Sequence, residues 1–111
     1  MTVFLIHEPV RWNGSRMVAL DMSPAKDYGE LKVIFPGQDR PPCVAEAMPA
    51  IADAMGLFTE NDYLVIAGDM DLLIWAAALA LENTKGKVRL LRWDNRGRRY
   101  EVSEAPTEYF N

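Results

Sequence analysis

The chain has 111 residues, of which 16 are acidic, 12 are basic and 50% are apolar, and it contains one cysteine. A chain of this length can bury about two thirds of its surface, so it can form a core without disulfides or a structural metal. We therefore expect a single domain spanning residues 1–111. One cysteine excludes an intramolecular disulfide and any multi-cysteine metal site. The longest apolar run, 72–81, is shorter than the roughly 18 residues of a membrane span, which favours a soluble, cytoplasmic protein.

The charge is unevenly distributed along the chain. Residues 1–84 hold 12 acids and 5 bases, a net charge of −7, whereas residues 85–99 hold 7 bases and one acid, a net charge of +6. The total of −4 argues against nonspecific wrapping of nucleic acid. The local basic segment can still contact phosphate or an acidic protein surface.

The N-terminal part of the chain predicts a strand, followed by a turn and a second extended stretch outside it. Residues 3–6 are a short apolar run of β type, and the turn residues 12–15 introduce a second extended stretch at 17–20. Further on, the order of Ser23 and Pro24 predicts a short helix, with Ser23 as N-cap and Pro24 at the first helical position.

The middle of the chain alternates strands and helices. Residues 31–35 predict a strand, and a helical segment follows from Pro41 to about residue 57, in which Pro49 either kinks the helix or starts a new one. Residues 63–67 are a continuous apolar run, typical of a strand buried on both faces, which we expect at the centre of the sheet. A helix from about 70 to 83 follows.

The C-terminal part predicts a β-hairpin. Residues 87–93 and 98–102 are extended stretches joined by the turn residues 94–97. With the preceding elements they give two βαβ units, and hence three parallel strands. We expect the N-terminal strand and the last hairpin strand to extend this sheet with antiparallel edges. The predicted fold is a small three-layer α/β sandwich with a mixed, mostly parallel sheet and a C-terminal β-hairpin.

Two carboxylates stand where the central strand meets a helix. Asp69 and Asp71 follow Gly68, and paired acids separated by one residue can share a magnesium ion, as in Toprim folds. Toprim chemistry also needs a glutamate at the end of an earlier strand, and the strand 31–35 ends without one. The alternative is structural, with Asp69 as N-cap and Asp71 favouring the helix dipole.

Other candidate groups favour structural roles. No glycine-rich dinucleotide or P-loop motif is present, so no cofactor is expected. His7 is the single histidine and cannot build a zinc site alone. Cys43 stands at a helix start without an identifiable partner base, so neither residue predicts catalysis.

The helix containing residues 72–81 is apolar on all sides, whereas a helix that covers one face of a small sheet should have a polar stripe. We therefore expect burial on two sides, either within the chain or against a second subunit in an isologous homodimer. The predicted dimer interface comprises Leu72, Trp75, Ala76, Leu79 and Ala80.

The C-terminal hairpin is rich in arginine and aromatic residues. The candidate interaction residues are Arg89, Arg92, Trp93, Arg96, Arg98, Arg99 and Tyr100. Arginines and flat rings suit phosphate contact and base stacking, so nucleic-acid binding is one hypothesis. In the alternative, Trp93 and Tyr100 form a cross-strand pair and the arginines lie on a solvated face.

Three stretches carry a resemblance to a known family. They are DMSPAKDYGEL at 21–31, DYLVIAGD at 62–69 with the alanine-rich helix after it, and GKVRLLRWD at 86–94. With them the chain resembles a family of small uncharacterised tailed-bacteriophage proteins. The resemblance implies an infected bacterial cytoplasm as the setting, and it implies no catalytic residues.

The sequence favours a non-enzymatic interaction protein that presents the basic hairpin to an acidic host or phage macromolecule, with a protein as the expected partner. Two alternatives stay open. One is a magnesium-dependent nucleotide or phosphodiester enzyme that uses Asp69 and Asp71, and the other is a nucleic-acid-binding protein that uses the same hairpin.

Overall fold

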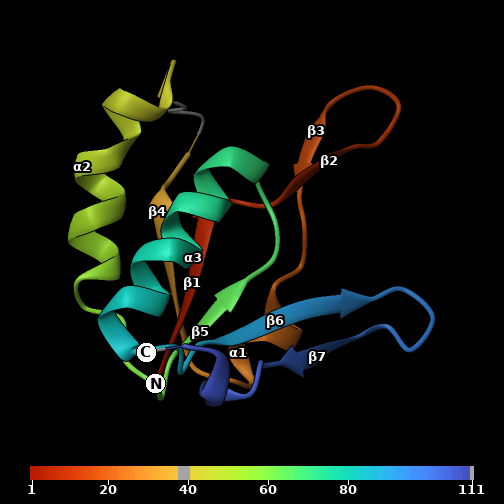
Figure 1. Ribbon diagram of the computed structural model, residues 1–111. Helices are drawn as coiled ribbons and strands as arrows, with labels where there is room; N and C mark the ends of the chain where they lie inside the picture. The colour runs from red at the N-terminus through yellow and green to blue at the C-terminus, as the bar shows by residue number, and fades with distance from the viewer. Residues whose placement is uncertain (38–40, 111) are drawn as a thin grey trace.

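The computed structural model describes residues 1–37 and 41–110, and its main sheet has five strands in the order β4-β1-β5-β6-β7 (Figure 1). In chain order the strands are β1 (Thr2–His7), β4 (Glu30–Phe35), β5 (Tyr63–Val65), β6 (Arg89–Asp94) and β7 (Arg99–Ser103). Strands β4, β1, β5 and β6 are parallel, and β7 pairs antiparallel with β6. The predicted α/β fold with a mostly parallel sheet and a C-terminal hairpin is confirmed.

The N-terminal strand β1 lies inside the sheet, between β4 and β5 and parallel to both. The prediction that it forms an antiparallel edge is therefore wrong. The physical reason is its burial: residues 3–6 are at most 2% exposed, although their side chains point alternately to the two faces. A strand that is apolar on both faces is stable only where layers cover both sides. The prediction that β5 is the central strand is confirmed.

Helices cover the two faces of the sheet unequally (Figure 1). Helices α2 (Val44–Met55) and α3 (Met70–Thr84) pack against each other on one face, where they meet side chains such as Phe4 and Leu64. On the other face, Val3 and Leu5 pack with residues of the single short helix α1 (Ser23–Lys26). The third layer of the predicted sandwich is therefore one helical turn supported by neighbouring side chains.

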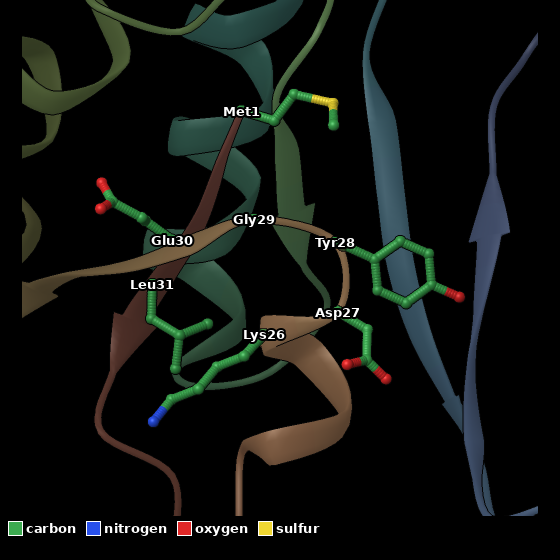
Figure 2. Close-up of a pocket in the computed structure, with 7 residues that line it drawn as sticks. All are labelled: Met1, Lys26, Asp27, Tyr28, Gly29, Glu30 and Leu31. Atoms are coloured by element: carbon green, nitrogen blue, oxygen red, sulfur yellow. The ribbon is translucent and has the colours of Figure 1, made fainter.

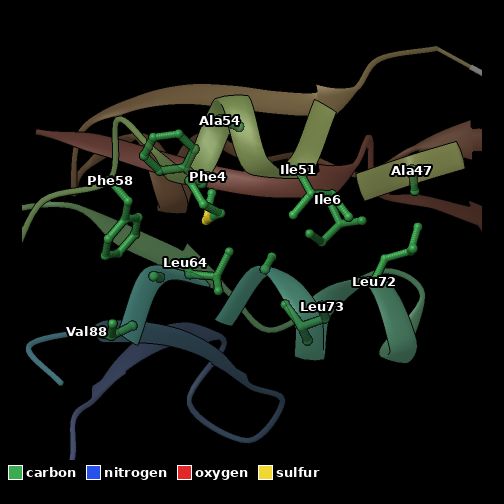
Figure 3. Packing of buried hydrophobic residues seen from close by; sticks show 13 residues of the cluster. Phe4, Ile6, Ala47, Ile51, Ala54, Phe58, Leu64, Leu72, Leu73 and Val88 are labelled. Atoms are coloured by element: carbon green, nitrogen blue, oxygen red, sulfur yellow. The ribbon is translucent and has the colours of Figure 1, made fainter. Parts of the chain in front are cut away.

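The larger core lies between the sheet and helices α2 and α3 (Figure 3). Phe4 and Phe58 are its largest fully buried side chains, with ring centroids 5.5 Å apart. Ile51 contributes from α2 and Leu64 from β5. Asn83 of α3 donates through Nδ2 to the carbonyl oxygen of Phe58 at 2.7 Å, which ties α3 to the loop after α2.

The ends of two helices differ from the predicted capping. Ser23 is the first residue of α1 rather than its N-cap, which is Met22. The Ser23 hydroxyl instead donates to the Asp21 carboxylate at 2.6 Å, and this hydrogen bond lowers the pKa of Asp21. Asp69 is the N-cap residue of α3 by position, but its side chain makes no capping hydrogen bond. The Asp69 carboxylate is therefore directed to another group, His7, rather than to the helix backbone.

Helix α2 continues through Pro49 as one helix of 12 residues. Of the two alternatives left open by the sequence, a fresh helix start at the proline is excluded. Cys43 is the N-cap of α2, so the helix begins two residues after the Pro41-Pro42 pair rather than at it. Pro49 is solvent-exposed, on the side of α2 away from the core.

A second, two-stranded sheet projects from the body of the protein as a hairpin arm (Figure 1). It consists of β2 (Val10–Trp12) and β3 (Met17–Ala19), which are antiparallel. The extended stretch at 17–20 was predicted, whereas β2 was not, because it has three residues and directly follows Pro9. Asn13 Oδ1 accepts the backbone N–H groups of Ser15 and Arg16, which fixes the turn.

The C-terminal segment packs back against the body. After the 3₁₀ turn η1 (Thr107–Tyr109), the ring of Phe110 lies over Gly86, where a Cβ would come within 2.5 Å of it. Both chain ends lie near the end of α3 (Figure 1). Within residues 1–37 and 41–110, no helix has both the length and the hydropathy that a membrane span needs.

Candidate functional site

The β6–β7 hairpin separates its aromatic and basic side chains onto opposite faces. Trp93 pairs directly with Tyr100, and their rings lie 5.0 Å apart in an edge-to-face arrangement. This pair lies on the α1 side, where Tyr28 donates through its hydroxyl to the Tyr100 carbonyl oxygen at 3.2 Å. Burial raises the pKa of the Tyr100 hydroxyl. The aromatic pair is thus the cross-strand pair of the structural alternative.

Two of the candidate arginines are held by contacts within the chain. Arg92 lies directly opposite Glu101 and donates to its carboxylate at 2.9 Å. The guanidinium of Arg89 stacks on the ring of Tyr63 at 4.0 Å and donates to the carbonyl oxygen of Asn61. The Arg92 guanidinium is therefore paired within the chain, and the Arg89 guanidinium is held against Tyr63, although its Nε, which is buried, has no hydrogen-bond partner among the described residues.

The remaining three arginines form a basic tip, which we define as Arg96, Arg98 and Arg99. All three are exposed, and in the described part of the chain none forms an ion pair with a carboxylate. The Asp94 carboxylate accepts the backbone N–H groups of Arg96 and Gly97, each at 3.1 Å. These two hydrogen bonds fix the conformation of the turn, so the basic tip has a defined geometry.

The acidic C-terminal segment does not neutralise the basic tip. Glu104 and Thr107 line a shallow depression with Lys87 at the opposite end of the hairpin. Lys87 pairs with Glu60 at 3.3 Å. Figure 1 shows the hairpin turn projecting away from both chain ends. Among the described residues, the basic tip is therefore solvent-exposed and lies away from the acidic C-terminal segment.

The carboxyl ends of β1 and β5 bring together a histidine and an aspartate. His7 Nε2 lies 3.1 Å from Asp69 Oδ2, and the His7 side chain is 4% exposed. His7 is the last residue of β1 and Asp69 follows β5, at the point where the strand order reverses, which is the usual ligand position in open α/β sheets. This pairing was not predicted from the sequence, because β1 was expected at an edge of the sheet.

The predicted magnesium site finds limited support. Asp69 contacts His7, whereas Asp71 Oδ1 accepts the backbone N–H of Leu72 at 2.9 Å. Among residues 1–37 and 41–110, no group of three His, Cys, Asp or Glu side chains is placed to hold a metal ion. The prediction that the Asp69 side chain caps α3 is wrong, because the carboxylate turns to His7 instead.

Gly68 permits this close packing of β1 against the start of α3. Its φ is +99°, and an added Cβ would lie 3.1 Å from Ile6 Cβ and 3.2 Å from His7 Cδ2. We expect Gly68→Ala to lower the free energy of unfolding by about 2 to 3 kcal/mol, as backbone strain and crowding add. Urea unfolding monitored by circular dichroism measures the change.

Gly14 provides the matched control for Gly68. Its φ is +101°, and no atom lies within 4 Å of the position of an added Cβ. Gly14→Ala carries the backbone strain without the crowding, so we expect a loss of only about 1 kcal/mol. Equal losses in the two variants would contradict the argument that Ile6 and His7 crowd this position.

A shallow depression lies at the opposite end of the sheet, near the start of β1 and β4, with a volume of about 870 Å³ (Figure 2). Lys26, Asp27 and Glu30 at its rim point in different directions. Gly29 closes its floor, because an added Cβ would lie 2.5 Å from the carbonyl oxygen of Met1. Without converging polar groups, this surface has no arrangement suited to a ligand.

The residues of the predicted dimer interface divide between core and surface. Leu72, Ala76 and Ala80 are buried within the chain, so in this fold they are not available to a second subunit. Leu79 is partly buried against the same core, and Trp75 is half exposed. The outward face of α3 instead presents an apolar stripe, which we define as Met70, Ile74, Trp75 and Ala78.

Comparison with known proteins gives one family. No curated protein and no solved structure matches the chain significantly. A family model described as Phage Pam3 gp32-like protein matches residues 1–107. This match covers nearly the whole chain and agrees with the resemblance seen in the sequence. The chain therefore belongs to the Phage Pam3 gp32-like protein family.

Proposed function

We propose that the protein is a non-enzymatic interaction protein of the infected bacterial cytoplasm, and that its basic tip binds an acidic protein surface. The observation that carries this proposal is the unneutralised charge of Arg96, Arg98 and Arg99 on a locked turn. Arginine guanidinium groups bind carboxylates in a bidentate geometry, and a rigid turn reduces the entropy lost on binding.

A protein partner is favoured over nucleic acid for two reasons. The overall charge is −4, and residues 1–84 carry −7, so most of the surface repels a polyanion. In addition, the rings of Trp93 and Tyr100 pack against each other on the face opposite Arg92. Base stacking and phosphate contact therefore cannot act together on one face of the hairpin, as single-strand binding would require.

A magnesium-dependent enzyme built on Asp69 and Asp71 has less support than binding. The two carboxylates turn to different groups, His7 and the backbone of Leu72. An ion held by both would have to displace these contacts. The interaction hypothesis requires no rearrangement of the structure, because the basic tip is already exposed.

The test is a pulldown of the tagged full chain from bacterial lysate, with and without nuclease, followed by affinity measurement on the captured protein. We expect a nuclease-resistant partner with an acidic surface. The variant Arg96→Ala/Arg98→Ala/Arg99→Ala should bind it at least tenfold more weakly, because charge-assisted contacts are lost. The affinity of the unchanged protein should also fall with salt.

The matched control removes three positive charges elsewhere. Lys26, Lys32 and Lys85 are exposed, and Lys26→Ala/Lys32→Ala/Lys85→Ala changes the net charge equally. We expect this variant to keep its affinity for the partner within about threefold. It retains the contacts of the basic tip, and distant charges affect mainly the rate of association. Unchanged binding by the basic-tip variant would refute the proposal. Material that is captured only without nuclease would establish nucleic-acid binding instead.

A further inference from the structure

The hairpin arm formed by β2 and β3 is amphipathic. Val10 lies opposite Ala19, and Trp12 lies opposite Met17, so alternation places these four side chains on one face of the arm. All four are solvent-exposed, and Trp12 is 62% exposed. We define these four residues, Val10, Trp12, Met17 and Ala19, as the arm face. An exposed apolar surface of this kind is typical of a site that contacts another apolar surface.

Nothing in the described part of the chain covers the arm face. Apart from the pairing of β2 with β3, no described helix or strand makes an extensive contact with the arm. A two-stranded hairpin alone is marginally stable in water, and it gains stability by packing its apolar side. The arm is nevertheless closed at both ends, by the Asn13 turn and by a hydrogen bond from Leu20 N–H to the Pro9 carbonyl oxygen at 2.9 Å.

The same chain presents a second unpartnered apolar surface, the apolar stripe of α3. Ile74 is 59% exposed, and Met70, Ile74 and Ala78 are spaced by four residues along one line of the helix. This line is about 12 Å long, because each helical residue adds 1.5 Å. The arm face extends about 7 Å along each of its two strands, so it can cover more than half of this line.

Charge also makes the two surfaces complementary. Residues 9–20, which form the arm, contain two arginines and no acid, whereas residues 70–84 of α3 contain two acids and no base. Arg16 is exposed at the turn of the arm, and Asp71 and Glu82 are exposed on α3 at the two ends of the apolar stripe. An arm with positive charge at its turn and a helix with exposed carboxylates beside its apolar stripe are electrostatically complementary between two copies of the chain.

We propose that two copies of this chain form a reciprocal dimer in which the arm face of each copy packs on the apolar stripe of the other. Each arm–helix contact is then repeated by the twofold axis, as in any isologous interface. Each copy contributes both surfaces, including the large exposed side chains of Trp12, Ile74 and Trp75, so the area buried per copy is twice that of a single arm–helix contact. This doubling moves the buried area toward the about 800 Å² per partner of a stable interface. The proposal is independent of the basic tip, which stays free in the dimer.

The proposal is tested by sedimentation velocity on the full chain between about 1 and 100 µM. We expect a monomer–dimer equilibrium in this range. An arm variant, Trp12→Ser/Met17→Ser, and a helix variant, Ile74→Glu, should each raise the dimer dissociation constant at least tenfold. Leu57→Ser is the control. Leu57 is an apolar residue that is 64% exposed and belongs to neither the arm face nor the apolar stripe, so this substitution should leave the dimer dissociation constant unchanged.

Mixing the two variants tests the reciprocal geometry. In a heterodimer of arm variant and helix variant, the intact arm of the helix variant meets the intact α3 of the arm variant, so one of the two contacts is restored. We expect the equimolar mixture to dimerise more strongly than either variant alone, while circular dichroism shows that both are folded. A monomer at about 100 µM, a dimer unaffected by the arm variant, or a mixture without heterodimer would each overturn the proposal.

Discussion

Replacing Phe58 by alanine is expected to lower the free energy of unfolding by about 3 to 5 kcal/mol. The Phe58 side chain is 1% exposed and lies between the sheet and the two long helices (Figure 3). Its backbone is held in place by the side chain of Asn83 at 2.7 Å. The loop therefore cannot move into the space left by the ring, and the cavity stays open. Guanidinium unfolding of the variant and the unchanged protein measures the difference.

The adjacent Leu57 is the control for this substitution. It is 64% exposed, so Leu57→Ala should change the free energy of unfolding by less than about 0.5 kcal/mol. A double-mutant cycle with Phe4→Ala should give a coupling energy of about 1 kcal/mol, because the two rings are in direct contact. If Leu57→Ala were as destabilising as Phe58→Ala, the core would not be centred on this ring pair.

The elements with strong local patterns were the ones that the sequence could predict. The helix 70–83 and the strand 63–67 each have a long apolar pattern, and α3 and β5 lie within one or two residues of them. The three-residue strand β2 has no such pattern, because three residues after a proline show neither period. Its pairing depends on the turn at Asn13 and on a partner seven residues away.

The position of β1 depended on long-range information. A run of four apolar residues fits an edge strand or an interior strand equally well by periodicity. Only the strand order places β1 between β4 and β5, and that order also joins His7 to Asp69 across 62 positions of sequence. The failure to connect the two residues thus follows directly from the wrong placement of the strand.

The separation of the hairpin side chains onto two faces could have been predicted from the sequence. A turn at residues 94–97 sets Trp93 opposite Tyr100 and Arg92 opposite Glu101, and the period of two then puts these pairs on opposite faces. The interaction hypothesis took all seven side chains as one surface, although the structural alternative already set Trp93 against Tyr100 across the strands. Once the paired side chains and Arg89 are set aside, Arg96, Arg98 and Arg99 remain as the exposed charge.

Replacing Asp62 by alanine is expected to lower the free energy of unfolding by about 2 to 4 kcal/mol, because the donor groups of Thr2 and Thr59 would lose a charged acceptor. Asp62 is 7% exposed. Its Oδ1 accepts the backbone N–H of Thr2 at 2.8 Å, and its Oδ2 accepts the backbone N–H of Thr59 at 2.8 Å and the Thr59 hydroxyl at 3.0 Å. One carboxylate thus joins the start of β1 to the loop before β5.

Asp62→Asn separates the loss of hydrogen bonds from the loss of packing. An amide keeps one acceptor oxygen but presents an NH₂ group toward donors at the other site, so we expect an intermediate loss of about 1 to 2 kcal/mol. Asp53→Asn is the matched control, since Asp53 is exposed on α2 and should change stability by less than about 0.5 kcal/mol. Urea unfolding of all three variants gives the comparison. Equal stability of Asp62→Asn and the unchanged protein would show that the three donors find water instead, and that β1 is held by the sheet alone.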